Sequence, residues 1–455
     1  MDKKLSFQSH VVIGLMLFAL FFGAGNLIFP AQLGQQAGST VWIATLGFLM
    51  TGVGLPLLGI LAIGYSKSRD LQDLSSRVHP IYGIIFTSLL YLTIGPFFAL
   101  PRTGAVSFEV GIAPFVNEGS IGTALLVFSI IFFAIALVLS LNPSRMVNSI
   151  GKFLSPAIVV TIGVLLVAAL FAPMGGFGEP QGNYVESSFL TGFLEGYNTM
   201  DALASLVFGI IVISAVRSMG VTSPKGVLRA TLKSGLVAAF LLAVVYAGIA
   251  YLGATSTGVL GFMDNGGPVL SGASAHYFGT FGSLLLAVII TLACLTTAVG
   301  LIVANAEFFH KLIPSIGYKT FVAIFAIFSL VVTNAGLSNI ITYSIPVLMF
   351  LYPLAIVMII LAFASPLFKH ARFVYVSVTV VTFLIAIIDG LKTLTGSLEV
   401  ANPAPLQGII DFYTAYLPLY EAGLGWLLPA LIVLIITGVI AQTKKTAHVP
   451  AVSKS

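Results

Sequence analysis

The sequence predicts an all-α polytopic membrane protein with about twelve transmembrane helices. Hydrophobic residues make up 58% of the 455 residues and charged residues only 8%, whereas soluble domains carry roughly 25% charged residues. Two of the apolar segments are interrupted near their middle, by Gly23-Ala24-Gly25-Asn26 and by 195–201. A helix that breaks inside a bilayer is tolerated only where its free backbone groups are packed in protein or line a cavity. In secondary transporters such breaks form the binding site.

The apolar segments that are long enough to cross a bilayer follow one another along the whole chain. Their approximate bounds are 11–33, 40–64, 80–101, 120–141, 153–172, 188–216, 234–253, 279–305, 318–334, 338–364, 372–391 and 425–442. The polar stretches between them are too short to fold as an extramembrane catalytic or ATPase domain. We therefore expect one membrane transport domain over 5–442, followed by a short cytoplasmic tail over 443–455.

The first segment (11–33) is broken by its glycines and then stopped by Pro30. Lys3 and Lys4 before an apolar run also resemble a secretory signal peptide. The proline stop and the glutamine-rich stretch 32–36 instead fit the end of a helix that stays in the membrane.

The sixth segment (188–216) has its own interruption at the place that corresponds to the break in the first. Because five is an odd number of spans, a second five-helix unit must be inserted upside down relative to the first. We expect a 5+5 inverted repeat with broken first and sixth helices, formed by 10–173 and 187–365, and two extra C-terminal helices in 371–442. Paired interruptions in inverted halves are the best sequence pointer to a site at the middle of the membrane.

The residues at the two breaks suit a chain that leaves a helix and re-enters it. Gly23, Gly25 and Gly196 reach non-helical φ and ψ angles at low cost. The side chains that can cap the resumed helices are Asn26, Asn198, Thr199 and Asp201.

The distribution of lysine and arginine predicts the orientation. With the N-terminus inside, all of the 20 lysines and arginines except Arg102 and Lys392 fall on the cytoplasmic side. Cytoplasmic loops carry an excess of these residues, so both termini are expected in the cytoplasm. The sequence pI of about 9.1 follows from this topology and indicates no nucleic-acid partner.

Motifs of enzymes and of cofactor-binding proteins are missing from the sequence. It has no P-loop, no HExxH and no cluster of metal ligands, and its six histidines are scattered. Gly23-Ala24-Gly25 is not a dinucleotide-binding fingerprint, because the third glycine would fall at Ile28 and no strand precedes it. Cys294 is the single cysteine, which excludes an intramolecular disulfide. We expect no catalytic residue, no cofactor and no enzyme activity.

The eighth segment (279–305) contains two adjacent hydroxyls, Thr296 and Thr297, one turn after the carbonyl of Ala293. Neutral oxygens in such a cluster suit a sodium ion. The alternative is ordinary helix structure, because threonines in membrane helices often donate to the carbonyl four residues earlier.

Together these features resemble the branched-chain amino acid:cation symporter family of BrnQ-like carriers, in the amino acid-polyamine-organocation superfamily with its LeuT-type fold. The similarity to the carriers extends over essentially the whole chain. Its most specific pieces are FALFFGAGNLIFP in the first segment, YLTIGPFFALPRT in the third and GFLEGYNTMDALASLVFG in the sixth. The similarity to the wider fold rests on the Gly25-Asn26…Pro30 spacing and on Ala-x-Leu-Thr-Thr in the eighth segment.

The resemblance implies a sodium ion, as the coupling ion, between the first and eighth segments. Its ligands would be the carbonyls of Ala19, Phe22 and Ala293 and the hydroxyls of Thr296 and Thr297. Asn26 and Thr199 can supply oxygens to a second sodium, but we find no matching partner in the seventh segment.

The family also implies an apolar branched-chain amino acid as the substrate, a bacterial cytoplasmic membrane as the location, and a carrier that can work as a monomer. An α-amino acid is a zwitterion, and both charged ends need partners once water is removed. We expect N–H groups around Gly25–Asn26 to bind the carboxylate and carbonyls near 197–199 to bind the ammonium, with no fixed opposite charge. The expected substrate-binding residues are Gly23, Ala24, Gly25, Asn26, Phe97, Phe98, Tyr197, Asn198 and Thr199.

Among the charged residues within or beside the spans, Asp201, Glu195, Glu307 and Arg102 are candidates for a functional role. Asp201 either handles a proton or cation or caps the half-helix that follows, where the helix dipole favours its charge. Glu195 and Glu307 are weaker candidates for the first role, and Glu307 is expected at the cytoplasmic end of the eighth segment. Arg102, directly after Pro101, is expected at the outer end of the third segment, where it would gate access.

The leading hypothesis is a sodium-coupled importer of leucine, isoleucine and valine that works by alternating access. One rival couples transport to protons through Asp201 or Glu195, and another is an uncoupled facilitator or channel. A membrane-embedded enzyme would require clustered His, Asp or Cys within the spans, which the sequence lacks. One methylene changes binding by only about 1–3 kcal/mol, so overlap among the three amino acids is expected.

Overall fold

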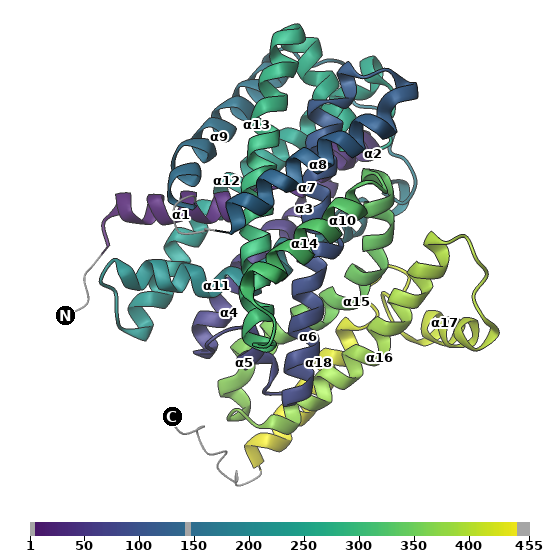
Figure 1. The fold of residues 1–455 in the computed structure, drawn as a ribbon. Coiled ribbons are helices and arrows are strands. Elements are labelled where there is room, and N and C mark those ends of the chain that lie inside the picture. Colours follow the sequence, from purple (N-terminus) through teal and green to yellow (C-terminus); the bar gives the residue numbers. More distant parts are fainter. Residues whose placement is uncertain (1–4, 142–146, 444–455) are drawn as a thin grey trace.

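The computed structural model describes residues 5–141 and 147–443, the side chains of 147–156 excepted. Over these residues the chain consists of helices joined by turns and loops, without strands (Figure 1). This confirms the predicted all-α class. The predicted tail lies outside the described residues except for Thr443, and so do Lys3 and Lys4, on which part of the orientation argument rests.

The first half of the chain contains the helices of the first five predicted segments. The α-helices are α1 (Phe7–Phe21), α2 (Ala24–Ala37), α3 (Val41–Leu49), α4 (Leu55–Ser66), α5 (Leu71–Ser75), α6 (Pro80–Leu92), α7 (Ala99–Gly111), α8 (Ile121–Ser140) and α9 (Val147–Phe171). Short 3-10 or π-helical turns join some of them: η1 (Gly38–Thr40), η2 (Met50–Gly54), η3 (Thr93–Phe97), η4 (Ala113–Phe115) and η5 (Glu118–Ser120).

The second half begins with another interrupted helix. Its elements are α10 (Tyr184–Glu195), η7 (Gly196–Thr199), α11 (Asp201–Ser218), α12 (Pro224–Leu260), α13 (Gly266–Leu312), α14 (Tyr318–Thr333), α15 (Leu337–Ala364), η8 (Ser365–Phe368), α16 (Arg372–Ser397), α17 (Ala404–Tyr416) and α18 (Leu427–Thr443). Eight helical stretches of the described chain are individually long and apolar enough to cross a bilayer. Shorter apolar helices supply the remaining predicted spans.

The third predicted segment differs most from expectation. It is kinked at Gly95 (φ −93°, ψ −126°) and continues beyond residue 101 as α7. The following Pro96 has no N–H and cannot continue a regular helix. A Cβ atom on Gly95 would collide with the side-chain amide of Asn305 in α13, so the kink also lets these two helices approach closely. A second unpredicted kink, at Gly279 (φ 60°), divides α13.

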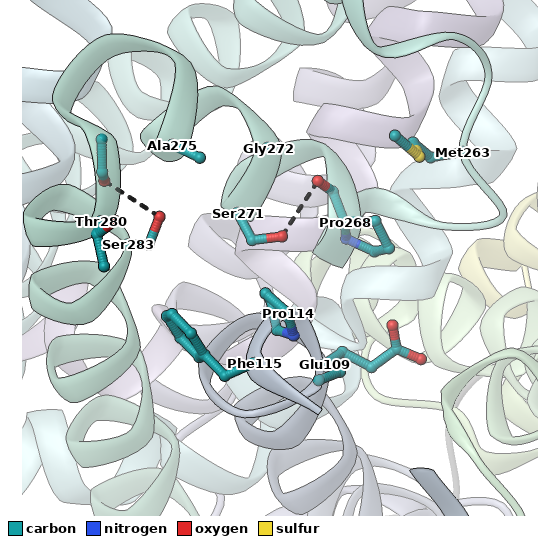
Figure 2. A pocket seen from close by; sticks show the side chains of 12 residues that line it. Glu109, Pro114, Phe115, Met263, Pro268, Ser271, Gly272, Ala275, Thr280 and Ser283 are labelled. Carbon is teal, nitrogen blue, oxygen red and sulfur yellow. Dashed lines mark hydrogen bonds between the residues drawn. The ribbon is translucent and has the colours of Figure 1, made fainter. Parts of the chain in front are cut away.

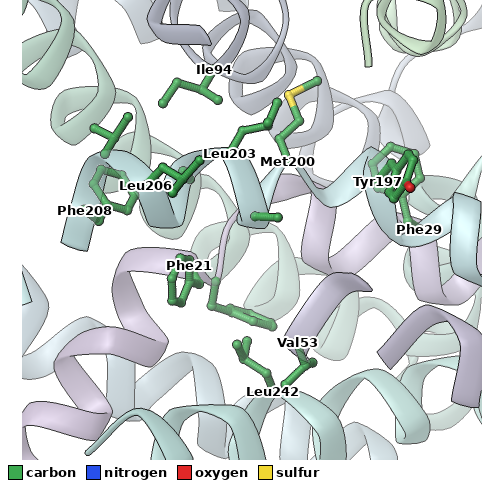
Figure 3. Packing of buried hydrophobic residues seen from close by; sticks show 14 of the residues in the cluster. Phe21, Phe29, Val53, Ile94, Tyr197, Met200, Leu203, Leu206, Phe208 and Leu242 are labelled. Atoms are coloured by element: carbon green, nitrogen blue, oxygen red, sulfur yellow. The ribbon is translucent and has the colours of Figure 1, made fainter. Parts of the chain in front are cut away.

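The half-helices of the two breaks each pack closely against one neighbouring helix. Helices α1 and α2 pack on α12, α3 packs on α10, and α4 packs on α11, while α7 packs along α13. Helix α16 packs on α15 and on α18, and Figure 1 shows α16, α17 and α18 at one edge of the bundle. Apolar side chains fill the space around the breaks (Figure 3), among them Phe21, Phe29, Met200, Leu203, Leu206 and Leu242.

Glycines set the distances between these helices, because helices in a membrane associate through close backbone packing. A Cβ atom on Gly34 or Gly253 would run into a backbone carbonyl across the α2–α12 contact. Helices α3 and α10 meet in the same way through Gly47 and Gly192. Any larger residue at these four positions would therefore push two backbones apart.

We expect Gly253→Ala to lower the free energy of unfolding by about 1–3 kcal/mol, because overpacking forces the α2 backbone away from α12. Gly258→Ala on the same helix is the matched control, since no atom lies within 4 Å of the added methyl. Both substitutions replace a helical glycine of α12 by a better helix former, so the difference between their thermal unfolding midpoints in detergent reports chiefly on the clash. Equal midpoints would contradict the prediction.

Candidate functional site

The first helix break lies between α1 and α2. Helix α1 ends at Phe21, Phe22 has an extended ψ of 99°, and Gly23 (φ −133°, ψ −162°) precedes the start of α2. In a continuous helix the Gly23 N–H would bond to the Ala19 carbonyl, but here it donates to Asn26 Oδ1 at 2.8 Å. The Ala19 carbonyl is thereby released from the helical pattern, as carbonyls at a helix C-terminus are.

The second break falls within the predicted interval 195–201. The 3-10 turn η7 ends at Thr199, and Met200 adopts a left-handed conformation (φ 62°, ψ 8°) before α11 starts at Asp201. A non-glycine residue there costs of order 1 kcal/mol. Local hydrogen bonds hold it: the Met200 N–H donates to the Tyr197 carbonyl at 3.0 Å, and the Asp201 N–H donates to Thr199 Oγ1 at 3.3 Å.

A buried polar cluster joins the two breaks. The Asn26 side-chain amide donates to Asp201 Oδ2 at 2.5 Å and also to the Tyr246 hydroxyl, which itself donates to Asp201 Oδ2 at 3.0 Å. These three residues belong to α2, α11 and α12. Met200, the N-cap residue of α11, makes no capping hydrogen bond, and the Asp201 carboxylate bonds across helices rather than acting as the cap that the sequence allowed. Glu195 lies apart from this cluster and accepts from the Asn198 amide at 2.8 Å.

The placement of Arg102 corrects two expectations. The sequence indicated an outer helix end at Pro101, but Pro101 lies in the first turn of α7, where a proline is tolerated because its missing N–H is not needed. The Arg102 side chain is only 2% exposed, and its Nη1 donates to the Asn198 carbonyl at 2.8 Å. Arg102 is therefore not at an outer end. Arg102 and Asp201 are both buried beside the breaks, where the sequence analysis expected a site that needs no fixed charge.

The hydroxyls of the eighth predicted span lie near the first break. Thr296 and Thr297 Oγ1 both donate to the Ala293 carbonyl, at 2.7 Å and 3.1 Å. This is the bonding that ordinary membrane helices show. A Cβ atom placed on Gly23 would lie 3.5 Å from Thr297 Oγ1, so the fold brings α13 and the α1–α2 break together at this point.

The three aromatic candidates are placed differently from one another. Tyr197 is buried and stacks on Tyr352 of α15, with ring centroids 4.0 Å apart. Phe97 packs at 5.5 Å from Phe328, a ring that is 43% exposed on α14, so Phe97 lies toward the bundle surface. Phe98 is partly buried and packs against the core. Tyr197 is thus the aromatic candidate that belongs to the breaks.

A half-open pocket of about 620 Å³ lies between the end of α7 and the beginning of α13 (Figure 2). Its lining includes Glu109, Phe115, Met263 and Ser271, but no residue of either break. The break residues themselves are buried in protein. The pocket is therefore separate from the site that the breaks form.

Three residues at the breaks escaped the sequence analysis: Tyr246, Tyr352 and Phe29. Tyr246 lies in α12, the seventh predicted span, and its hydroxyl forms hydrogen bonds with both Asn26 and Asp201. A tyrosine within an otherwise apolar span is a usable signal, because a buried hydroxyl usually finds a hydrogen-bond partner.

Comparisons with known sequences give a consistent result. Residues 6–444 match a family model described as branched-chain amino acid transport protein. The chain is 48% identical over 431 residues to the branched-chain amino acid permease BrnQ of Bacillus subtilis (strain 168), covering 95% of this chain and 96% of the relative. It is 46% identical to the branched-chain amino acid transport system 2 carrier protein of Pseudomonas aeruginosa, covering 94% of each.

Solved structures of membrane transporters share the fold. Mhp1 in an inward-facing conformation superposes with a TM-score of 0.59 at 16% identity, covering 95% of this chain and 91% of Mhp1. A manganese transporter of Eremococcus coleocola superposes with a TM-score of 0.55 at 17% identity, covering 97% of each chain. At these identities the likeness establishes the fold alone, and it confirms the predicted LeuT-type architecture.

We expect Tyr246→Phe to lower the free energy of unfolding by about 1–3 kcal/mol, because the buried Asp201 carboxylate and Asn26 amide each lose a partner. Tyr251→Phe on the same helix is the matched control, since the Tyr251 hydroxyl forms no hydrogen bond within the described residues. Thermal unfolding in detergent compares the two. A Tyr246→Phe protein as stable as the control would mean that the cluster contributes nothing to stability.

Proposed function

Because the chain belongs to the branched-chain amino acid transport protein family, whose members are transporters rather than enzymes, we propose that it imports leucine, isoleucine and valine by sodium symport. The proposed substrate follows from the names of the relatives. The observation that carries the proposed mechanism is that the Asn26–Asp201 hydrogen bond joins the two helix breaks, and that Thr297 of α13 lies beside the first of them. The proposed coupling ion is sodium, carried as a second substrate.

The substrate lies at the breaks in this proposal. Its carboxylate meets the N–H groups of Gly25 and Asn26 at the start of α2, and its ammonium meets carbonyls near Tyr197 and Thr199. Residues 23–26, Asn198 and the aromatic rings complete the site. Two local features support the arrangement. Gly23 provides no side-chain cap for the first turn of α2, so no cap competes there with a carboxylate. Tyr197 is buried at the second break.

The sodium ion binds between the first break and α13. Its proposed ligands are the carbonyls of Ala19, Phe22 and Ala293 and the hydroxyls of Thr296 and Thr297. Two observations favour this set: the Gly23 N–H bonds to Asn26 and leaves the Ala19 carbonyl free, and Thr297 lies beside Gly23. Freed carbonyls at half-helix ends are the groups that hold coupling ions in transporters of this kind.

The transport cycle follows from the proposed repeats. Helices α1–α4 and α10–α12 rock as one group against a scaffold of α6–α8, α13 and α14, so that the breaks face each side of the membrane in turn. The repeats are 10–173 and 187–365, and both termini face the cytoplasm. One net charge moved with a neutral zwitterion is worth roughly 2.3 kcal/mol per 100 mV. That potential alone supports accumulation of about 50-fold.

The Asn26–Asp201–Tyr246 cluster favours a second candidate, in which Asp201 carries the coupling. A carboxylate inside a membrane protein marks a proton or cation site by default. This one joins the two broken helices and α12, so protonation or cation binding there would act directly on the moving group. Glu195 is the weaker alternative, because it contacts Asn198 and not the cluster.

We expect leucine uptake into proteoliposomes to require an inward sodium gradient, and Thr297→Ala to reduce that uptake at least about 10-fold by removing one ion ligand. The measurement is labelled-leucine uptake at fixed pH, with and without the gradient. Thr437→Ala on α18 is the matched control, because Thr437 is also half-buried and donates to the carbonyl four residues earlier. The control should transport like the wild type.

Three other outcomes have definite meanings. Uptake that ignores sodium and Thr297 but follows a proton gradient moves the coupling to Asp201, and Asp201→Asn should then abolish accumulation. Uptake that never exceeds equilibrium identifies a facilitator. Equal losses in Thr297→Ala and Thr437→Ala would reject the sodium site between α1 and α13.

A further inference from the structure

The Arg102 guanidinium lies between the two helix breaks and contacts both. Its Nη1 donates to the Asn198 carbonyl in η7 at 2.8 Å. On the α2 side, a Cβ atom placed on Gly25 would lie 3.0 Å from Nη2, and the Phe29 ring centroid lies 4.9 Å from Cζ. The side chain reaches this position from α7. Arg102 therefore connects α7, which is not one of the two broken helices, with the break before α2 and with the break at η7.

This buried cation has few partners of its own. Nε has no hydrogen-bond partner among the described residues, and no carboxylate of the described chain forms an ion pair with the guanidinium. Asp201 acts on it only through its charge, since Oδ2 of that carboxylate is held by Asn26 and Tyr246. A buried charge whose counter-ion is not in direct contact is unfavourable. The guanidinium fork matches a carboxylate, which it binds through two parallel hydrogen bonds.

The first turn of α2 attracts the same kind of ligand. The helix is 14 residues long, and Gly23 gives its N-terminus no side-chain cap. The first N–H groups of a helix have no carbonyl partner within it, and they carry the positive end of the helix dipole. Gly25 lies in this turn and has no side chain between its backbone and Arg102 Nη2. Backbone donors and a guanidinium thus converge on one place.

We propose that Arg102 binds the carboxylate of the transported amino acid, together with the first turn of α2. The identity of the ligand rests on the proposed function, because an α-amino acid brings the carboxylate. The sequence analysis expected only backbone N–H groups to bind the carboxylate, whereas this proposal adds the positive charge of the Arg102 guanidinium. Since α7 belongs to the scaffold and α2 to the moving group, the bound carboxylate links the two groups of helices during the cycle.

The test compares leucine with leucinamide, which keeps the ammonium and the side chain but has no carboxylate. Affinities of the purified full-length protein are measured in sodium by thermal-shift titration. Wild type should prefer leucine by about 10- to 100-fold, the range for hydrogen bonds to a charged group. Arg102→Gln should weaken leucine by a similar factor and leave leucinamide within about 3-fold, so that the preference disappears.

A purely structural arginine gives a different pattern. If Arg102 only held the Asn198 carbonyl, Arg102→Gln would weaken leucine and leucinamide equally, and that result overturns the proposal. Arg77→Gln is the matched control, because Arg77 also donates to a backbone carbonyl, that of Ser66, but lies in the loop after α5. Arg77→Gln should keep the wild-type preference for leucine over leucinamide. If Arg102→Gln does not fold, Arg102→Lys serves: a reduced preference supports the proposal and an unchanged one overturns it.

A second pair of ligands separates this proposal from the proposed function. 4-Methylpentanoate has the carboxylate without the ammonium, and 4-methylpentanamide is its neutral counterpart. A wild-type protein that leucine, isoleucine and valine do not stabilise contradicts the proposed function. An Arg102-dependent preference for 4-methylpentanoate would then still support the carboxylate site. No such preference, or one that survives Arg102→Gln, would overturn it.

Discussion

The need to satisfy backbone groups at two helix breaks governs the centre of this protein. At membrane depth no water is available to an N–H or C=O group that leaves a helix. At the first break, Asn26 takes the Gly23 N–H and thereby releases the Ala19 carbonyl. At the second, the Met200 and Asp201 N–H groups bond to Tyr197 and Thr199. The same side chain that closes the first break also reaches Asp201, so each break depends on the other.

Two opposite charges are buried at this place, and they do not form an ion pair with one another. Asp201 is held by Asn26 and Tyr246, whereas Arg102 holds the Asn198 carbonyl and lies against Phe29. Burying charges is favourable only when their partners are in good geometry. The carboxylate has such partners in the described chain, and the guanidinium has one hydrogen bond and an aromatic face. The two residues therefore differ: the Asp201 carboxylate joins three helices, whereas the Arg102 Nε–H has no hydrogen-bond partner among the described residues.

Close packing through glycine explains how broken helices remain stable. Gly34 and Gly253 bring α2 and α12 into backbone contact, and Gly47 and Gly192 do the same for α3 and α10. Dispersion contacts and close approach replace the hydrophobic effect, which does not draw helices together in lipid. The α1 and α2 half-helices are thus held by neighbours on several sides although their own hydrogen-bond ladder is interrupted.

The sequence by itself determined the class, the order of the apolar segments and the position of both breaks, because hydropathy and glycine-rich interruptions are local properties. It also identified Asn26, Tyr197, Thr199 and Asp201 as residues of the breaks. Only the tertiary structure decided which distant side chains meet them. Pro101 looked like a helix end until the kink at Gly95 made it part of a new first turn, which carries Arg102 into the core. Tyr246 is one tyrosine among 15 in the sequence, and its role arises from the packing of α12 on α2, a contact between segments far apart in the chain.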